Sequence, residues 1–225
     1  MSNKKNIQEP EITVQETLSK TEKFLETYKK PLLSAAAGVI ILAAAIFAYH
    51  NFVTLPKQQE AMGQTFVAEQ LFRADNFEQA LNGDGNSLGF KQIISEYGSK
   101  GGEAVYFYAG VCELQLGNYK EAIDYLKRYS GEEPILAARA IGCIGDAYAG
   151  LGDLKSAATE YKKAADADNS IFAANYLLKA GIVNEELGNT ADALKFYQTI
   201  KDKYAQSPEG FEINKYISRI EVAQK

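Results

Sequence analysis

The stretch LGNYKEAIDYL, at residues 116–126, decides the fold because shortened copies of it recur downstream. The copies read LGDLKSA and LGNTADA. The glycines of the three copies lie 35 and 36 residues apart: Gly117, Gly152 and Gly188. A fixed period of this length is typical of proteins built from repeated helical hairpins. The sequence therefore predicts an all-α fold in which helix pairs stack into a solenoid.

Further columns of similar residues keep the same period. One holds glycine, one holds alanine and one holds a large apolar residue: Gly110, Gly145 and Gly181; Ala122, Ala157 and Ala193; Tyr106, Ile141 and Leu177. Small residues let two helices approach closely, and the large residue fills the space between neighbouring hairpins. Each glycine of the LG pairs is expected to end a first helix. The residue after it, which is Asn118, Asp153 or Asn189, suits a turn and a cap on the second helix.

Both ends of the repeat array deviate from the pattern. Ala68, Phe77 and Ala80 mark a fainter first copy, whose second helix is interrupted by NGDGNSLG at residues 82–89. This segment lacks the glycine and glutamate positions of a calcium-binding EF-hand loop, so we interpret it as a plain loop. At the other end, SPEGFEINKYISRI predicts a capping helix, with Ser207 as its N-cap and four packing residues: Phe211, Ile213, Ile217 and Ile220.

Residues 32–53, LLSAAAGVIILAAAIFAYHNFV, carry no charged side chain and are long enough for a transmembrane helix. Lys29 and Lys30 precede this span, whereas only Lys57 lies close after it. This bias predicts a cytoplasmic amino terminus and an exported remainder. We therefore expect three parts: a cytoplasmic tail with an amphipathic helix at residues 1–31, the span at 32–53, and the repeat domain at 54–225.

Two other interpretations of the apolar run remain open. A cleaved signal peptide could end near Ile46 and Ala48, or the run itself could be a buried helix of a soluble protein. In the tail, apolar residues recur with helical spacing: Val14, Leu18, Thr21, Leu25 and Tyr28. Such a stripe fits a helix lying on the membrane surface, or one that contacts a membrane or cytoplasmic partner.

Charge and composition exclude several classes of function. The net charge is −5 and there is no basic stripe, so nucleic-acid binding is not expected. The single histidine, His50, lies at the end of the apolar run, which leaves the repeat domain without the usual base for a nucleophilic serine or cysteine. We expect no catalytic residue, no metal and no cofactor. Cys112 and Cys143 fit two buried thiols, with a disulfide as the alternative in an oxidising compartment.

The segment GVCELQLGNYKEAIDYLKRYSGEEP, ending in Pro134, resembles the tetratricopeptide repeat. The resemblance implies protein binding in the concave surface of the solenoid. The columns that line that surface predict the partner-binding residues: Phe107, Val111, Leu114, Arg139, Asp146, Asn175, Leu178 and Ile182. The alternative is ordinary packing of this face against the first hairpin or the capping helix.

Some members of the family hold peptide carboxyl termini with Asn and Lys side chains, in an arrangement called the carboxylate clamp. The matching columns here carry other residues: Tyr108 and Val111, Cys143 and Asp146, Lys179 and Ile182. A clamp of that kind is therefore not expected.

The order of segments adds a second resemblance. TVQETLSKTEKFLETYKK runs into PLLSAAAGVII and then into the repeats, which is similar to the YfgM-type ancillary subunits of the bacterial Sec translocon. This resemblance implies a single-pass protein of the bacterial inner membrane with a periplasmic repeat domain. Its partners would be translocon subunits, a membrane-anchored chaperone of the peptidyl-prolyl isomerase type, and emerging secreted chains. The alternative function is a structural scaffold subunit of another cell-envelope assembly.

Overall fold

A computed structural model describes residues 14–167 and 170–223, with side chains described from residue 22 onward except that of residue 26. The described residues form helices and no strand, which confirms the all-α prediction. The chain divides into two compact units, Met1–Pro56 and Lys57–Lys225.

The first unit contains helix α1, Val14–Tyr49, and a π-helical turn η1, His50–Thr54. Pro31 lies inside α1, so the predicted tail helix and the apolar span form one helix. Residues 1–13 and the side chains of Val14, Leu18 and Thr21 lie outside the described residues. Within the described part of the chain, one helix is long and apolar enough to cross a membrane. None of its apolar window is buried, which contradicts the buried-helix interpretation.

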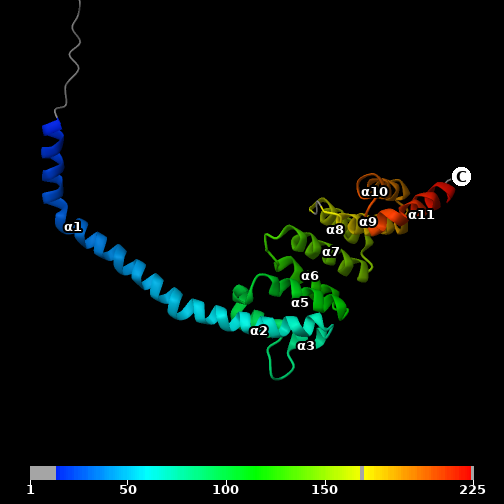
Figure 1. Ribbon diagram of the computed structural model, residues 1–225, viewed down its shortest axis with the longest axis horizontal. Coiled ribbons are helices and arrows are strands. Elements are labelled where there is room, and N and C mark those ends of the chain that lie inside the picture. The colour runs from blue at the N-terminus through cyan, green and yellow to red at the C-terminus, as the bar shows by residue number, and fades with distance from the viewer. Residues whose placement is uncertain (1–13, 168–169, 224–225) are drawn as a thin grey trace, which may run out of the picture. The chain divides into compact units, whose positions relative to one another are not determined.

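The second unit is a stack of antiparallel helices (Figure 1). In chain order its elements are α2, Leu55–Arg73; α3, Phe77–Asn82; α4, Phe90–Tyr97; the short 3-10 helix η2, Gly98–Gly101; α5, Ala104–Gln115; α6, Tyr119–Arg128; α7, Pro134–Gly150; α8, Leu154–Ala167; α9, Ala173–Glu186; α10, Thr190–Lys203; and α11, Pro208–Ala223.

Helices α5 to α10 form three hairpins, α5–α6, α7–α8 and α9–α10, and each hairpin packs against the next. The core is divided accordingly into clusters of buried apolar side chains within and between successive hairpins. The alanine column is fully buried at Ala122, Ala157 and Ala193. Because each hairpin buries its apolar surface mainly against its neighbours, the unit is an α-solenoid of the predicted kind.

The glycines that recur at helix crossings, Gly110, Gly145 and Gly181, each lie where the two helices of a hairpin pack closely. A Cβ on Gly110 would lie 2.6 Å from Cγ of Leu126, and one on Gly145 would lie 2.6 Å from Cδ1 of Tyr161. On Gly181 the distance to Cε1 of Tyr197 would be 2.2 Å. The two helices of each hairpin therefore pack closely at a point where only glycine fits.

The LG pairs end the first helix of each hairpin, as predicted. Gly117 has φ of +81°, in the left-handed region that favours glycine. Its N–H donates to the carbonyl of Leu114 at 3.1 Å, and the N–H of Asn118 donates to the carbonyl of Glu113 at 2.8 Å. This is the Schellman pattern of helix termination, and the same bonds recur after α7 and α9.

The residue after each of these glycines was predicted to cap the second helix of its hairpin, and only one of the three does so. Asp153 accepts a hydrogen bond from the N–H of Ser156 at 3.1 Å and so caps α8. The side chain of Asn118 instead donates to Oε2 of Glu113 at 2.8 Å, and the side chain of Asn189 donates to Asn184 at 3.4 Å. The difference arises because Glu113 and Asn184 offer a buried polar acceptor one turn earlier.

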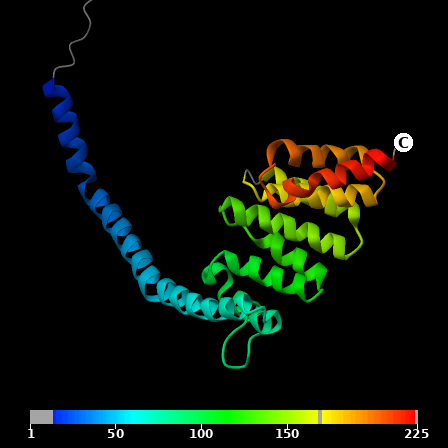
Figure 2. The same ribbon diagram turned by 45° about the vertical axis from the view of Figure 1, so that its right-hand side comes forward.

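The first hairpin consists of α2 and a second helix split into α3 and α4, as the faint copy predicted. The intervening loop protrudes from the stack (Figure 2). One carboxylate oxygen of Asp84 accepts the backbone N–H groups of Asn86 and Ser87, at 2.9 and 2.7 Å, and these bonds lower the pKa of Asp84. The acidic side chain of this loop therefore stabilises its own turn, consistent with a plain loop.

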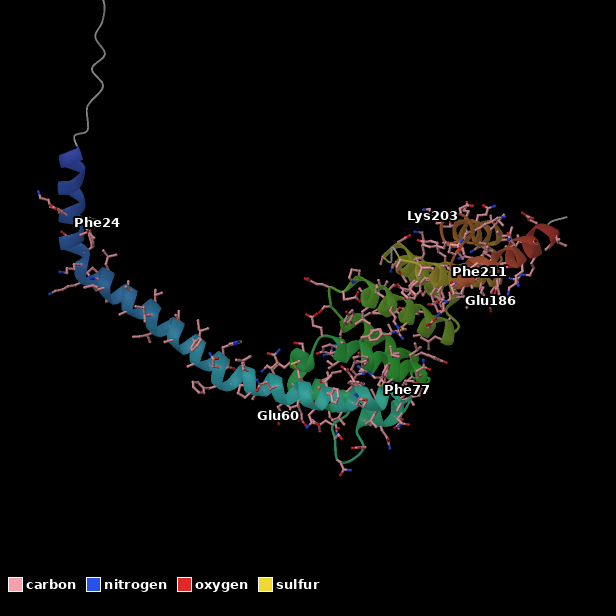
Figure 3. All side chains as sticks on the ribbon, viewed as in Figure 1. Phe24, Glu60, Phe77, Glu186, Lys203 and Phe211 are labelled. Atoms are coloured by element: carbon pink, nitrogen blue, oxygen red, sulfur yellow. The ribbon has the colours of Figure 1, made fainter. Side chains whose placement is uncertain are left out.

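Helix α11 caps the carboxyl end of the solenoid. Ser207 is buried and its hydroxyl accepts the N–H of Gly210 at 2.9 Å. Ile213, Ile217 and Ile220 are buried in the last core cluster. The prediction that Phe211 packs with them was wrong, since it is 71% exposed on α11 (Figure 3). Two helical residues before Ile213, it is rotated by about 200° from the isoleucine stripe.

Candidate protein-binding groove

The first helices of the three regular hairpins line one cavity of about 440 Å³. Helix α7 forms its centre, with α5 on one side and α9 on the other. Its lining residues are Val111, Leu114, Gln115, Ile135, Arg139, Gly142, Cys143, Asp146, Phe172, Asn175, Tyr176 and Lys179. We refer to this cavity and these twelve residues as the groove.

The structure brings five of the eight predicted partner-binding residues into the groove: Val111, Leu114, Arg139, Asp146 and Asn175. They come from three helices. Val111 and Asp146 lie 35 residues apart and Arg139 and Asn175 lie 36 apart, so each of these pairs occupies one column of the repeat. Val111 is buried in the wall, whereas Arg139 and Asn175 are exposed to solvent.

The other three predicted residues lie elsewhere. Phe107 is 2% exposed and belongs to the core cluster between α5, α6 and α7. Leu178 packs against the cluster that contains the isoleucines of α11. Ile182 is exposed but does not line the groove. Leu178 therefore fits the alternative interpretation, which is ordinary packing against the capping helix. Helix α11 occupies the position that a further hairpin would otherwise take.

An ion pair joins two walls of the groove. Nζ of Lys179 on α9 lies 2.7 Å from Oδ1 and 2.9 Å from Oδ2 of Asp146 on α7. The hydroxyl of Tyr161 also donates to Oδ1 of Asp146, at 2.8 Å. Burial and then the nearby carboxylate raise the pKa of Tyr161, so this phenol stays protonated and remains a donor. The charges of Lys179 and Asp146 therefore largely satisfy each other.

Arg139 is the remaining cation of the groove. Its guanidinium lies over the ring of Phe107, with Cζ 5.6 Å from the ring centroid. Among the side chains that the structure describes, no carboxylate lies within ion-pair distance of it. The buried ring thus supports an exposed guanidinium that has no carboxylate partner among the described side chains.

Two exposed apolar side chains form one end of the groove. Ile135 is in the first turn of α7 and is 46% exposed, and Phe172 is the residue before α9 and is 57% exposed. The turn that carries Ile135 is fixed by Glu133, whose carboxylate accepts the N–H groups of Ile135 and Leu136 at 3.2 and 2.5 Å. The apolar end is therefore held by a capped helix start.

The two cysteines are free thiols in different surroundings. Cys112 is buried on α5, whereas Cys143 is half-buried and lines the groove. Burial raises the pKa of Cys112 to about 12 and that of Cys143 to about 11. Neither thiol has the lowered pKa of a nucleophilic cysteine.

Sequence reasoning did not include the other seven lining residues in this surface: Gln115, Ile135, Gly142, Cys143, Phe172, Tyr176 and Lys179. The sequence contains a signal for some of these residues. Ile135 lies four residues before Arg139, and three others lie three, four and seven residues after it: Gly142, Cys143 and Asp146. This spacing places them on one face of a helix. Lys179 lies 36 residues after Cys143 and so occupies the same column of the next repeat.

The groove contains apolar, amide and charged groups, which suit noncovalent binding of a polypeptide. No group of three or more metal-binding side chains occurs within the described ranges.

Residues 104–134 and 144–208 each match a family model described as tetratricopeptide repeat. Among solved structures, "MamA RS-1 ArsTM double mutant" is 16% identical with a TM-score of 0.53, and the match covers 86% of this chain and 94% of that chain. "Crystal structure of MamA" is 18% identical with a TM-score of 0.51, covering 68% and 92%. At these identities the likeness concerns the fold. No curated protein matches the sequence.

Proposed function

We propose that this chain of tetratricopeptide repeats is a membrane-anchored adaptor that binds other polypeptides in the groove. The observation that carries the proposal is the groove itself, an open cavity formed by the first helices of three consecutive hairpins. Repeats of this kind are typically protein-interaction scaffolds rather than enzymes. Binding, not turnover, is therefore the activity we assign.

The anchor is the apolar helix of the first unit. Its length and composition support a single membrane crossing, and the lysines before the span favour a cytoplasmic amino terminus. The repeat domain then lies on the exported side, in the periplasm of a bacterium. Membrane attachment raises the effective concentration of the groove near other membrane proteins.

The partners we propose are the Sec translocon and a membrane-anchored chaperone of the peptidyl-prolyl isomerase type. The order of the juxtamembrane segments, which resembles YfgM-type translocon subunits, supports this assignment. The adaptor would receive secreted chains as they emerge and hold them for the chaperone. A groove with both apolar and charged groups suits segments of many sequences.

Quantitative affinity purification of the tagged protein in mild detergent tests the proposal. Translocon and chaperone subunits should be enriched, and enrichment of the chaperone should fall when the groove is altered by Ile135→Asp, at an exposed lining position. Val222→Asp on α11 is the matched control, because Val222 is exposed and lies outside the groove. Absence of translocon subunits, or equal effects of the two variants, would contradict the proposal.

The orientation has a separate test. In intact spheroplasts, added protease should remove a carboxy-terminal tag and leave an amino-terminal tag intact. A carboxy-terminal tag that is protected from protease would overturn the exported location of the repeat domain. It would not affect the proposal that the groove binds polypeptides.

A scaffold subunit of another envelope assembly is the second candidate. It is favoured by the outer face of α2, where Met62 and Phe66 are exposed and a Cβ on Gly63 would meet nothing within 4 Å. Such a face suits a permanent neighbour. Purification of envelope subunits without translocon subunits, in a manner sensitive to Phe66→Asp, would support this role instead.

A further inference from the structure

We propose that the groove selects an extended segment in which a carboxylate side chain and a large apolar side chain are two residues apart. The inference rests on the proposed binding role of the groove and adds the chemistry of the segment. Arg139 binds the carboxylate, and Ile135 with Phe172 contacts the apolar side chain. Three observations support it: the charge of the groove, the spacing along α7 and the size of the cavity.

The charge of the groove favours an acidic ligand. Its ionisable lining side chains with a fixed charge at neutral pH are Arg139, Lys179 and Asp146, which sum to +1 within a chain of net charge −5. Lys179 and Asp146 neutralise each other at 2.7 Å. Arg139 alone is left without an acidic partner among the described side chains, and a guanidinium binds a carboxylate through two parallel hydrogen bonds.

The spacing along α7 sets the distance between the two ligand side chains. Ile135 and Arg139 are four residues apart on one helix face, which corresponds to about 6 Å along the helix axis. In an extended chain, residues i and i+2 point to the same side and lie about 6.6 Å apart. An apolar residue and an acidic residue two positions apart can therefore contact the apolar end of the groove and the Arg139 guanidinium at the same time.

The size of the cavity favours an extended segment over a helix. From Ile135 to Asp146 the face of α7 is about 16 Å long, so the 440 Å³ open to the centres of water molecules has a mean cross-section of about 27 Å². Adding a water radius of about 1.4 Å at the rim gives a groove cross-section of about 60 Å². An extended strand occupies about 48 Å² and a helix about 80 Å² or more. The groove therefore has room for an extended strand but not for a whole helix.

Calorimetric titration of the full-length protein in detergent with short synthetic peptides tests the inference. The probe is acetyl-Gly-Ser-Leu-Gly-Asp-Ser-Gly-amide, together with the version in which Leu and Asp exchange places, because the chain direction is a variable. Both ends are blocked, so aspartate supplies the only carboxylate. We expect the tighter of the two to weaken about tenfold when Asp is replaced by Asn, since that change removes the charge-assisted bonds.

The protein variants assign the effect to one residue. Arg139→Gln should bind the Asp and Asn peptides equally, and Arg139→Lys should retain part of the preference. Arg128→Gln is the matched control, because Arg128 also lies over an aromatic ring, that of Tyr106 at 4.5 Å, but outside the groove. It should bind like the unaltered protein. Equal losses in Arg128→Gln and Arg139→Gln would overturn the inference.

The location of the peptide is read from the rate of Cys143 alkylation in a Cys112→Ala background, since Cys143 lines the groove. If peptides protect Cys143 but Asp and Asn versions bind equally, the inference fails and the proposed binding role stands. If no peptide protects Cys143, the proposed role of the groove fails as well. Dimerisation that depends on Arg139, without peptide binding, would show that a second copy occupies the groove and would also overturn the inference.

Discussion

Oε1 of Glu113 on α5 lies 2.8 Å from Nζ of Lys91 on α4, although Glu113 is fully buried and the Lys91 side chain is 39% exposed. The second carboxylate oxygen, Oε2, accepts the side-chain N–H of Asn118. A buried carboxylate is costly unless it is paired. The pair therefore joins the split second helix of the first hairpin to the regular hairpins.

Removing the lysine should destabilise the protein more than neutralising the glutamate. We expect Lys91→Met to lower the free energy of unfolding by about 2 kcal/mol, less than for a wholly buried pair because Lys91 is partly exposed. Glu113→Gln should cost about 1 kcal/mol, since the amide oxygen still accepts from Asn118. Urea unfolding measures both. Lys120→Met, at an exposed position on α6, is the control and should have no effect.

The same pair predicts a pH dependence. The bond to Glu113 raises the pKa of Lys91 above its ordinary value of 10.5. A raised pKa in the folded state means that the stabilisation is fully present below pH 10.5 and is lost as the pH rises through the folded value. The stability difference between the unaltered protein and Lys91→Met should therefore be constant at neutral pH and shrink in strongly alkaline buffer. A difference that grows with pH would contradict the ion pair.

The close helix crossing at Gly181 predicts a strong effect of one added methyl group. Gly181→Ala should lower the free energy of unfolding by about 1–3 kcal/mol, because its Cβ would meet the fully buried Tyr197 ring at 2.2 Å. Gly63→Ala is the comparison, since its Cβ would meet nothing within 4 Å on α2. It should be neutral or slightly stabilising, because alanine favours helix. Similar losses in both variants would refute the account of the crossing.

The two thiols should differ in reactivity. Cys143 is half-buried and its pKa is about 11, so its alkylation rate should rise about tenfold per pH unit between pH 7 and pH 10. Cys112 is fully buried and should react only when the protein unfolds. Mass spectrometry after timed alkylation distinguishes the two sites. Rapid labelling of Cys112 in the folded protein would show that the core around α5 is more open than described.

The repeat architecture was predictable because its causes are local and periodic. Gly117, Gly152 and Gly188 end helices through bonds within their own turns. The small residues at helix crossings recur at the same period. The stripe of isoleucines likewise predicted the buried face of α11, and the error at Phe211 came from treating a residue on the opposite side as part of that stripe.

The residues that line the groove were harder to predict from the sequence, because they depend on how far each helix is rotated about its axis within its hairpin. Columns placed Val111, Arg139 and Asp146 correctly on one surface, but the same reasoning included Phe107, which faces the core. The Lys179–Asp146 and Lys91–Glu113 pairs join residues 33 and 22 positions apart. No local pattern distinguishes such contacts from solvated charges.

Site-specific photocrosslinking in living cells shows whether the groove binds other polypeptides. A photoreactive amino acid replaces Gln115, an exposed residue of the groove on α5, or Lys162, an exposed residue on α8 outside it. We expect adducts with other polypeptides from position 115 that decrease in the Arg139→Gln background, and few from position 162. Equal adducts from both positions, or none from position 115, would contradict the claim that this groove binds proteins.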